Sequence, residues 1–271
     1  GQWVEYIPLS LIPDHGPLEF HVEGSENLYI DLAETLLHLQ VKITDSQGAD
    51  LAVDVAVGPV NLFLHSIFSQ VDVFLNHRQI SSSSPTYPYR AMIETLLSYD
   101  YGAKTSQAQS ALYYKDTPDK MDVVDPNAAD GQANKGLKNR AKLVWDDKSI
   151  DLMGKLHIDL FSQEKYLVNG VDLHVKCIRN WNNFCLLSPN DDADYKVVIQ
   201  SAALLVRKIQ IAPSVRLAHE KALMKGNAKY PITRVLCNVY SVGQGNMNMQ
   251  KDNIFNGELP KRVVIAMVDQ D

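Results

Sequence analysis

Cysteine, cationic charge and long apolar runs are all scarce in this sequence. The 271 residues include three cysteines and no CxxC pair, so the sequence indicates neither a disulfide framework nor a zinc site. No apolar run approaches the ~20 residues that span a bilayer. The first ten residues lack the basic and apolar regions of a secretory signal, and no Asn-x-Ser/Thr sequon occurs. These absences predict a chain that folds inside the cell and has no membrane-spanning segment.

Positive charge does not dominate any part of the chain. Lysine and arginine number 26 against 32 acidic residues, which gives a net charge of -6 and a pI near 5.7. Because polyanion-binding domains usually carry a basic excess, we expect no specific nucleic-acid binding. The densest basic group is interpreted as a solvated strand edge, where lysines block strand-on-strand association. It consists of Lys135, Lys138, Arg140 and Lys142.

Motifs that carry catalysis are also missing. The eight histidines form no HxH or HExxH pair, and His157 and His174 are expected to be solvent-facing or hydrogen-bonded strand residues. The SxxK match at 162–165 lacks its partner motifs. An acidic loop with Asp191, Asp192 and Asp194 lacks the glycine and the closing glutamate of an EF-hand. We therefore predict that the chain is not an enzyme and holds no cofactor or metal.

Alternating apolar and polar residues predict a strand-rich first part. Within 28–51, Leu37, Leu39, Val41 and Ile43 share one face, as in a strand with one side buried. Further strands are predicted at 17–22, 69–75, 141–147, 149–161, 171–180 and 196–211. About seven or eight strands before residue 212 are typical of an all-β sandwich.

Short helices are predicted in the loops between these strands. Helical spacing of apolar residues indicates one at 58–68, and a second is expected at 87–99 with Pro88 at its start. The polar stretch 115–138 contains scattered proline and glycine, which predicts a long surface loop on a rigid scaffold.

The pattern changes after Pro213. A helix is predicted there, with Ser214 as its N-cap and Gly226 as its stop, followed by strands at 232–242, 246–255 and 261–269. Three strands cannot close a sandwich, so they either pair with the first domain or begin a second one. Because 263–268 has the composition of a central strand, we expect the chain to be the front part of a longer protein.

Tyrosines gather in and after the second predicted helix. Tyrosine is enriched at protein interfaces because it buries a large area yet keeps a polar tip. These residues are therefore predicted to form a subunit interface, with packing over the core edge as the alternative. They are Tyr87, Tyr89, Tyr99, Tyr101, Tyr113 and Tyr114.

Several long strings of the sequence resemble one family. GPVNLFLHSIFSQVDVFLN, SSSSPTYPYRAMIETLLSY and DLMGKLHIDLFSQEKYLVNGVDLHVK are similar to the hexon-type major capsid proteins of Polinton/Maverick elements and adintoviruses. This family includes copies integrated in animal genomes. The resemblance continues through VVIQSAALLVRKIQIAPSVRLAHEKAL and KYPITRVL, so it covers nearly the whole chain.

The resemblance implies a double jelly-roll fold with short helices in loops. Residues 1–212 would be the first jelly-roll domain, 213–228 a connecting helix, and 229–271 the start of a second jelly roll that is incomplete here. It further implies self-association into pseudo-hexagonal homotrimers of an icosahedral capsid lattice, with penton and minor capsid proteins as partners. The protein would then be located in the virion capsid and assembled inside the host cell, in the nucleus or the cytoplasm.

Two other classes compete with the shell protein. The first is a penton-like or lectin-like jelly-roll binding module, or a domesticated host copy with an interaction role. A glycan-binding module needs an aromatic platform, and the three tryptophans are not clustered in sequence. The second is an enzyme on a cupin-like scaffold, which the missing HxH spacing argues against.

Overall fold

The alternation seen in the sequence produces the longest strands of the molecule. The computed structural model describes residues 1–271 except 13, 15, 191–193, 256, 258 and 269–271. The predicted stretch within 28–51 forms β3, Leu28–Thr44, and its four alternating apolar residues are at most 1% exposed. The predicted strand at 196–211 forms β10, Lys196–Gln210, which pairs antiparallel with β3 along its whole length.

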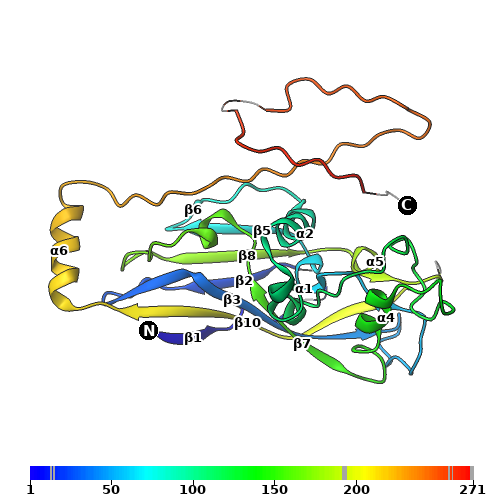
Figure 1. Ribbon diagram of the computed structural model, residues 1–271. Helices are drawn as coiled ribbons and strands as arrows, with labels where there is room; N and C mark the ends of the chain where they lie inside the picture. The colour runs from blue at the N-terminus through cyan, green and yellow to red at the C-terminus, as the bar shows by residue number, and fades with distance from the viewer. Residues whose placement is uncertain (13, 15, 191–193, 256, 258, 269–271) are drawn as a thin grey trace. The chain divides into compact units, whose positions relative to one another are not determined.

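Two four-stranded antiparallel sheets form the body of the molecule (Figure 1). In the first sheet, β10 and β3 lie between two edge strands, β1 (Gln2–Tyr6) and β7 (Ser149–Lys155). The second sheet has the order β2 (Leu18–Val22), β8 (Leu173–Arg179), β5 (Phe68–Leu75) and β6 (Arg78–Gln79). The short strands β4 (Gly58–Pro59) and β9 (Leu186–Leu187) pair separately.

The pairing order identifies the fold. Without the short β4 and β9, eight strands remain. The first pairs with the eighth (β1 with β10), the second with the seventh (β2 with β8), the third with the sixth (β3 with β7), and the fourth with the fifth (β5 with β6). A long antiparallel hairpin rolled into two facing sheets has this order, which is that of a jelly roll. The chain is thus an all-β jelly-roll sandwich with short helices, as predicted.

Helices occupy the connections between strands. The helix predicted at 87–99 is α2, with Pro88 in its first turn as expected. The others are α1 (Phe63–Ser66), α3 (Tyr101–Lys104), η1 (Gln107–Ala111), α4 (Lys135–Ala141), η2 (Asp159–Ser162), α5 (Asn182–Cys185) and α6 (Pro213–Leu223). Among the described residues, none of these helices has the length and apolar character needed to cross a membrane.

Two predictions about local structure were wrong. The helix predicted at 58–68 is reduced to α1, because Gly58 and Pro59 pair instead as β4 with β9. The strand predicted at 141–147 is the end of α4 followed by turns. Asp146 and Asp147 there have φ values of 61° and 59°, which a strand does not tolerate.

The boundaries of two other strands also differ from the prediction. The strand predicted at 149–161 ends at Lys155, and the chain continues into η2. The first strand, β1, was not predicted at all. Its apolar residues Trp3, Val4 and Tyr6 do not alternate strictly with polar ones, and none of its residues is fully buried, so the sequence gives only a weak strand signal.

The part of the chain after β10 contains no strand among the described residues. The predicted helix is present as α6, but Pro213 opens it, so Ala212 and not Ser214 is its N-cap residue. The strands predicted at 232–242, 246–255 and 261–269 are not found within the described residues. The chain divides into two units, residues 1–238 and 239–271, and the jelly roll lies in the first.

Candidate functional site

The six predicted interface tyrosines do not form one surface. Tyr87 and Tyr113 are only 4% and 5% exposed and belong to the core. Tyr101 on α3 is 79% exposed. The other three, Tyr89, Tyr99 and Tyr114, are half-buried. The alternative of core-edge packing therefore describes Tyr87 and Tyr113 in this chain, while the interface role of the other four stays a prediction.

Tyr87 connects two buried histidines. Its hydroxyl lies 2.9 Å from Nδ1 of His65 on α1 and accepts the backbone N–H of His157 at 3.3 Å. The two imidazole rings meet edge to face, with centroids 4.7 Å apart. Burial, and then the neighbouring His157, hold the pKa of His65 well below its usual range. His65 is therefore neutral and serves as a hydrogen-bonded core residue.

Charged side chains of α2 extend this cluster toward η2. Nδ1 of His157 lies 2.8 Å from Oε2 of Glu94, and Nε of Arg90 donates to Oε1 of Glu94 at 2.8 Å. Arg90 also donates to Oδ1 of Asp159 at 2.6 Å. Burial favours the neutral form of Glu94, but the His157 hydrogen bond and the Arg90 charge outweigh it, so the pKa of Glu94 is lowered. Glu94 is thus an ionised part of a connected network.

Hydrogen bonds from this network and nearby residues hold the chain beyond α6 on the sandwich. The carboxylate oxygens of Asp159 accept the backbone N–H of Val235 at 3.3 and 3.4 Å. Thr86, just before α2, donates to the carbonyl of Cys237 at 3.1 Å. The hydroxyl of Tyr230 accepts the N–H of Val168 at 3.0 Å. We call residues 229–238 the anchored segment, because side chains of the sandwich fix its backbone.

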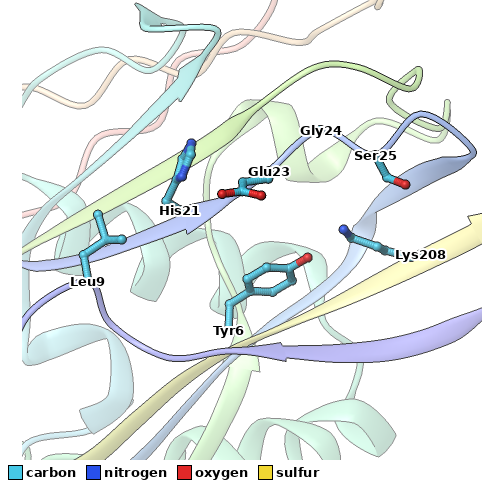
Figure 2. Close-up of a pocket in the computed structure, with 7 residues that line it drawn as sticks. All are labelled: Tyr6, Leu9, His21, Glu23, Gly24, Ser25 and Lys208. Atoms are coloured by element: carbon cyan, nitrogen blue, oxygen red, sulfur yellow. The ribbon is translucent and has the colours of Figure 1, made fainter.

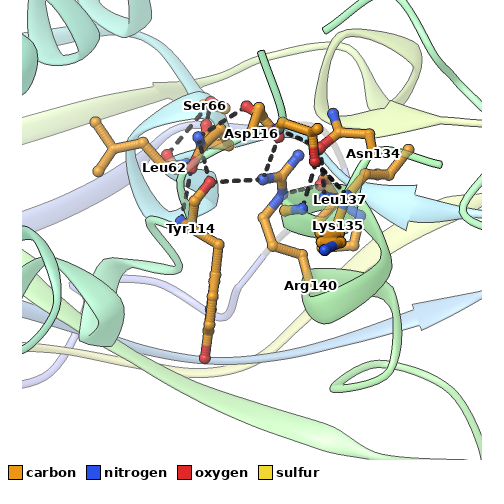
Figure 3. A network of polar contacts seen from close by, with 12 residues as sticks. Leu62, Ser66, Tyr114, Asp116, Asn134, Lys135, Leu137 and Arg140 are labelled. Carbon is orange, nitrogen blue, oxygen red and sulfur yellow. Dashed lines mark hydrogen bonds and ion pairs between the residues drawn. The ribbon is translucent and has the colours of Figure 1, made fainter. Parts of the chain in front are cut away.

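A second polar network fixes the long loop that precedes β7 (Figure 3). Arg140 on α4 is 1% exposed, and it donates to Asp116 Oδ1 at 2.9 Å, to the Pro59 carbonyl at 2.9 Å and to the Tyr114 carbonyl at 3.1 Å. Burial lowers the pKa of Arg140, and the nearby Asp116 opposes that shift. The prediction that Arg140 lies on a solvated edge was therefore wrong.

Two small features of the sequence make this buried ion pair possible. The side chain of Asn134 caps α4 by accepting the N–H groups of Gly136 and Leu137, as N-cap residues do. A Cβ atom on Gly136 would lie 2.6 Å from Oδ1 of Asp116. Glycine at this position lets the helix approach the Asp116 loop closely enough for Arg140 to reach it.

An open hollow of about 510 Å³ lies near the edge strands β1 and β2 (Figure 2). Figure 2 shows the ammonium of Lys208 directed toward the ring of Tyr6, with Glu23 and Ser25 across the hollow. The distance from Nζ of Lys208 to the ring centroid is 5.3 Å, within the range of a cation–π contact.

The remaining candidate residues are dispersed. His174 is half-buried and lies 3.1 Å from Glu19, and His157 is buried and hydrogen-bonded. Asp191 and Asp192 of the acidic loop lie outside the described residues. In the part of the chain that the structure does describe, no group of three or more His, Cys, Asp or Glu side chains is arranged to hold a metal ion.

Known proteins resemble this chain in structure but not detectably in sequence. No protein-family model and no curated protein matches the sequence significantly. Among solved structures, the chain is similar to the Faustovirus major capsid protein, with 8% identity, a TM-score of 0.48, and coverage of 82% of this chain and 56% of that one. It is also similar to the mavirus major capsid protein, with 11% identity, a TM-score of 0.45, and coverage of 79% and 47%. The chain thus spans about half the length of these structures.

Proposed function

We propose that this chain is part of a major capsid protein of the Polinton/Maverick and adintovirus type, which self-associates into pseudo-hexagonal trimers of an icosahedral shell. The strand order of the two sheets carries the proposal, because it is the jelly roll that the resemblance of the sequence implies. The described residues show networks that fix loops, and none of the arrangements found among them calls for a reaction mechanism.

Exposed apolar side chains support a function in association. The helix α6 buries none of its residues 213–223, and Leu217 on it is 52% exposed. Met224, directly after the helix, is 86% exposed. Large exposed apolar residues that gather on one element mark interaction sites. We infer that α6 packs against further protein in the assembled shell.

The domain organisation follows from the same proposal. Residues 1–212 would be the first jelly roll and 213–228 the connecting helix, and 229–271 would begin a second jelly roll. The exposed apolar residues of 239–268, such as Ile265 at 87% exposure, would gain strand partners there. The partners would be other copies of the chain, with penton and minor capsid proteins, in a virion capsid assembled inside the host cell.

The oligomeric state tests this function directly. A polypeptide that contains at least residues 1–271 would be studied by sedimentation and by negative-stain electron microscopy. We expect trimers with a pseudo-hexagonal outline. A strict monomer at high concentration, without capsomers, would contradict the proposal.

A tyrosine pair supplies a matched control for the interface. Tyr101→Ala removes an exposed ring and is expected to weaken the trimer without changing the melting temperature of the protomer. Tyr87→Ala removes a core ring and should lower the melting temperature instead. If Tyr101→Ala leaves the trimer dissociation constant unchanged, Tyr101 is not an interface residue.

A further inference from the structure

Lys208 occupies a position that the strand pattern reserves for an apolar residue. Along β10, Leu204, Val206 and Lys208 alternate on the inward-facing side, and the first two are fully buried. Lys208 itself is 8% exposed. A lysine is rarely this buried without a partner, and local violations of the core pattern tend to occur at functional sites.

No anionic side chain in the part of the chain that the structure describes pairs with the ammonium of Lys208. Among the described residues, no hydrogen bond or ion pair reaches its Nζ atom, and its one polar contact is the face of the Tyr6 ring. Arg207, the preceding residue on the opposite face of β10, does have a carboxylate partner in Asp31. The apolar stem of Lys208 is buried while its ammonium borders the open hollow, as is common for long cationic side chains, so the ammonium can pair with an anion that enters the hollow.

The hollow opens beside a free edge of the sandwich. Among the described residues, strand β1 pairs only with β10, so its other side presents unpaired backbone groups. Strand β2 is less accessible, because the carbonyl of Glu19 already accepts the N–H of Leu9 at 2.8 Å. Just beyond β1, Leu9 lines the hollow and is 63% exposed, while Leu11 is 95% exposed. An extended peptide could therefore pair with an edge and cover apolar side chains, as in β-strand addition.

The polar residues of the hollow define what such a peptide must carry (Figure 2). The Lys208 ammonium attracts a carboxylate, and the hydroxyls of Tyr6 and Ser25 can donate hydrogen bonds to it. The Glu23 carboxylate lines the same hollow, where it disfavours a doubly charged phosphate and can accept an N–H group. One aspartate or glutamate within an extended backbone supplies both the single negative charge and the N–H donors.

We propose that this hollow is a docking site for an extended segment of another polypeptide chain, with one acidic side chain seated on Lys208. The segment carries apolar residues on either side of the acidic one, and these cover Leu9 and Leu11. The proposal rests on the chemistry of the hollow alone, so it holds whether or not the chain forms capsid trimers.

Two synthetic peptides test the docking site. One is an acetylated, amidated heptapeptide that alternates valine and threonine around a central aspartate, and the other has asparagine in place of the aspartate. Binding is measured by amide chemical shifts of isotope-labelled protein. We expect the aspartate peptide to shift the amides of residues 2–6 and 23–25 and to bind roughly tenfold or more tightly than the asparagine peptide. Equal binding of the two peptides would overturn the proposal.

Variants separate a docking role from a structural one. Lys208→Met is expected to abolish the preference for aspartate without lowering the melting temperature, because it removes the charge but keeps an apolar side chain of similar length. Glu23→Gln, the control, should strengthen binding of the aspartate peptide. If Lys208→Met lowers the melting temperature and leaves the preference intact, Lys208 is only a structural partner of Tyr6 and the proposal fails.

A titration with small anions is the last control for the docking site. Acetate and inorganic phosphate are titrated at the peptide concentrations. Neither should shift the amides of 2–6, because a free anion does not pair with a strand edge. If either anion reproduces the shifts caused by the peptide, the hollow is a general anion site and the peptide proposal is wrong.

Discussion

The two units of the chain contain similar apolar sequences with opposite outcomes. In the first unit, Leu39 and Val41 lie in β3 between β10 and β7, and both are fully buried. In the second unit, residues 239–271, Val264 and Ile265 are 47% and 87% exposed. The described residues of the second unit contain no strand. An apolar, β-prone sequence becomes a strand only where an edge is available to pair with it.

The sharpest test of this difference compares the same substitution in both units. Leu39→Ala empties a site with 0% exposure and should lower the free energy of unfolding by about 4 kcal/mol. Leu259→Ala acts on a side chain that is 89% exposed and should change it by less than about 0.5 kcal/mol. Urea unfolding of the two variants measures both values. A similar cost at the two sites would show that the second unit has a core of its own.

The next test removes the buried cation of the first unit. Arg140→Met leaves the Asp116 carboxylate and two carbonyl groups without their donor, and should cost about 3 kcal/mol. The control is Lys142→Met, two residues further along, whose side chain is exposed and whose loss should cost almost nothing. Thermal unfolding compares the two. Equal melting temperatures would mean that the network of Arg140 contributes little to stability.

A smaller effect is expected from mild acid. Since His65 is neutral when folded, with a pKa lowered by burial and by His157, unfolding lets it bind a proton below its ordinary pKa of about 6.5. The free energy of unfolding should therefore fall by up to about 1.4 kcal/mol per pH unit below that value. The Glu94 pKa is also lowered, so its contribution is lost only at still lower pH. His65→Gln should flatten the stability profile between pH 7.5 and 5.5. An equally steep profile in this variant would assign the effect to other groups.

The smallest effect is expected from ending the chain at Asn238. This cut removes the second unit but keeps the anchored segment and its hydrogen bonds to Asp159 and Thr86. The free energy of unfolding of the first unit should change by less than about 0.5 kcal/mol, as it does for a typical surface substitution. Thermal unfolding of the shortened and the complete chain measures this change. A large loss would show that residues 239–271 support the sandwich.

Much of the sandwich could be predicted because its strands obey a simple alternation. In β3 the alternation persists over four buried residues, and β8 and the two ends of β10 follow the same rule. The prediction failed where long-range contacts decide the conformation. Residues 135–141 became a helix because Asn134 caps it and Arg140 finds Asp116, 24 positions away in sequence. No local pattern reveals such a partner.

The candidate site likewise has features that the sequence predicted and features that it did not. The sequence predicted α2 and drew attention to its tyrosines. It did not reveal that Tyr87 is a core residue that connects His65 to His157. One signal was available, since His65 stands within the apolar run NLFLHSIF, where a polar residue needs a buried partner. Lys208 gave a similar signal on β10. In both cases, a polar residue at an apolar position marked a feature that periodicity alone did not explain.

The pairing of the first strand with the last has a consequence for how the protein is made. Gln2 lies opposite Lys208 in the first sheet, so β1 must wait for more than two hundred residues to leave the ribosome before it has a neighbour. Contacts so distant in sequence slow folding, and sheets with open edges can aggregate during the delay. Production of such a chain should therefore depend on slow translation or on chaperones more than that of a helical protein of equal size.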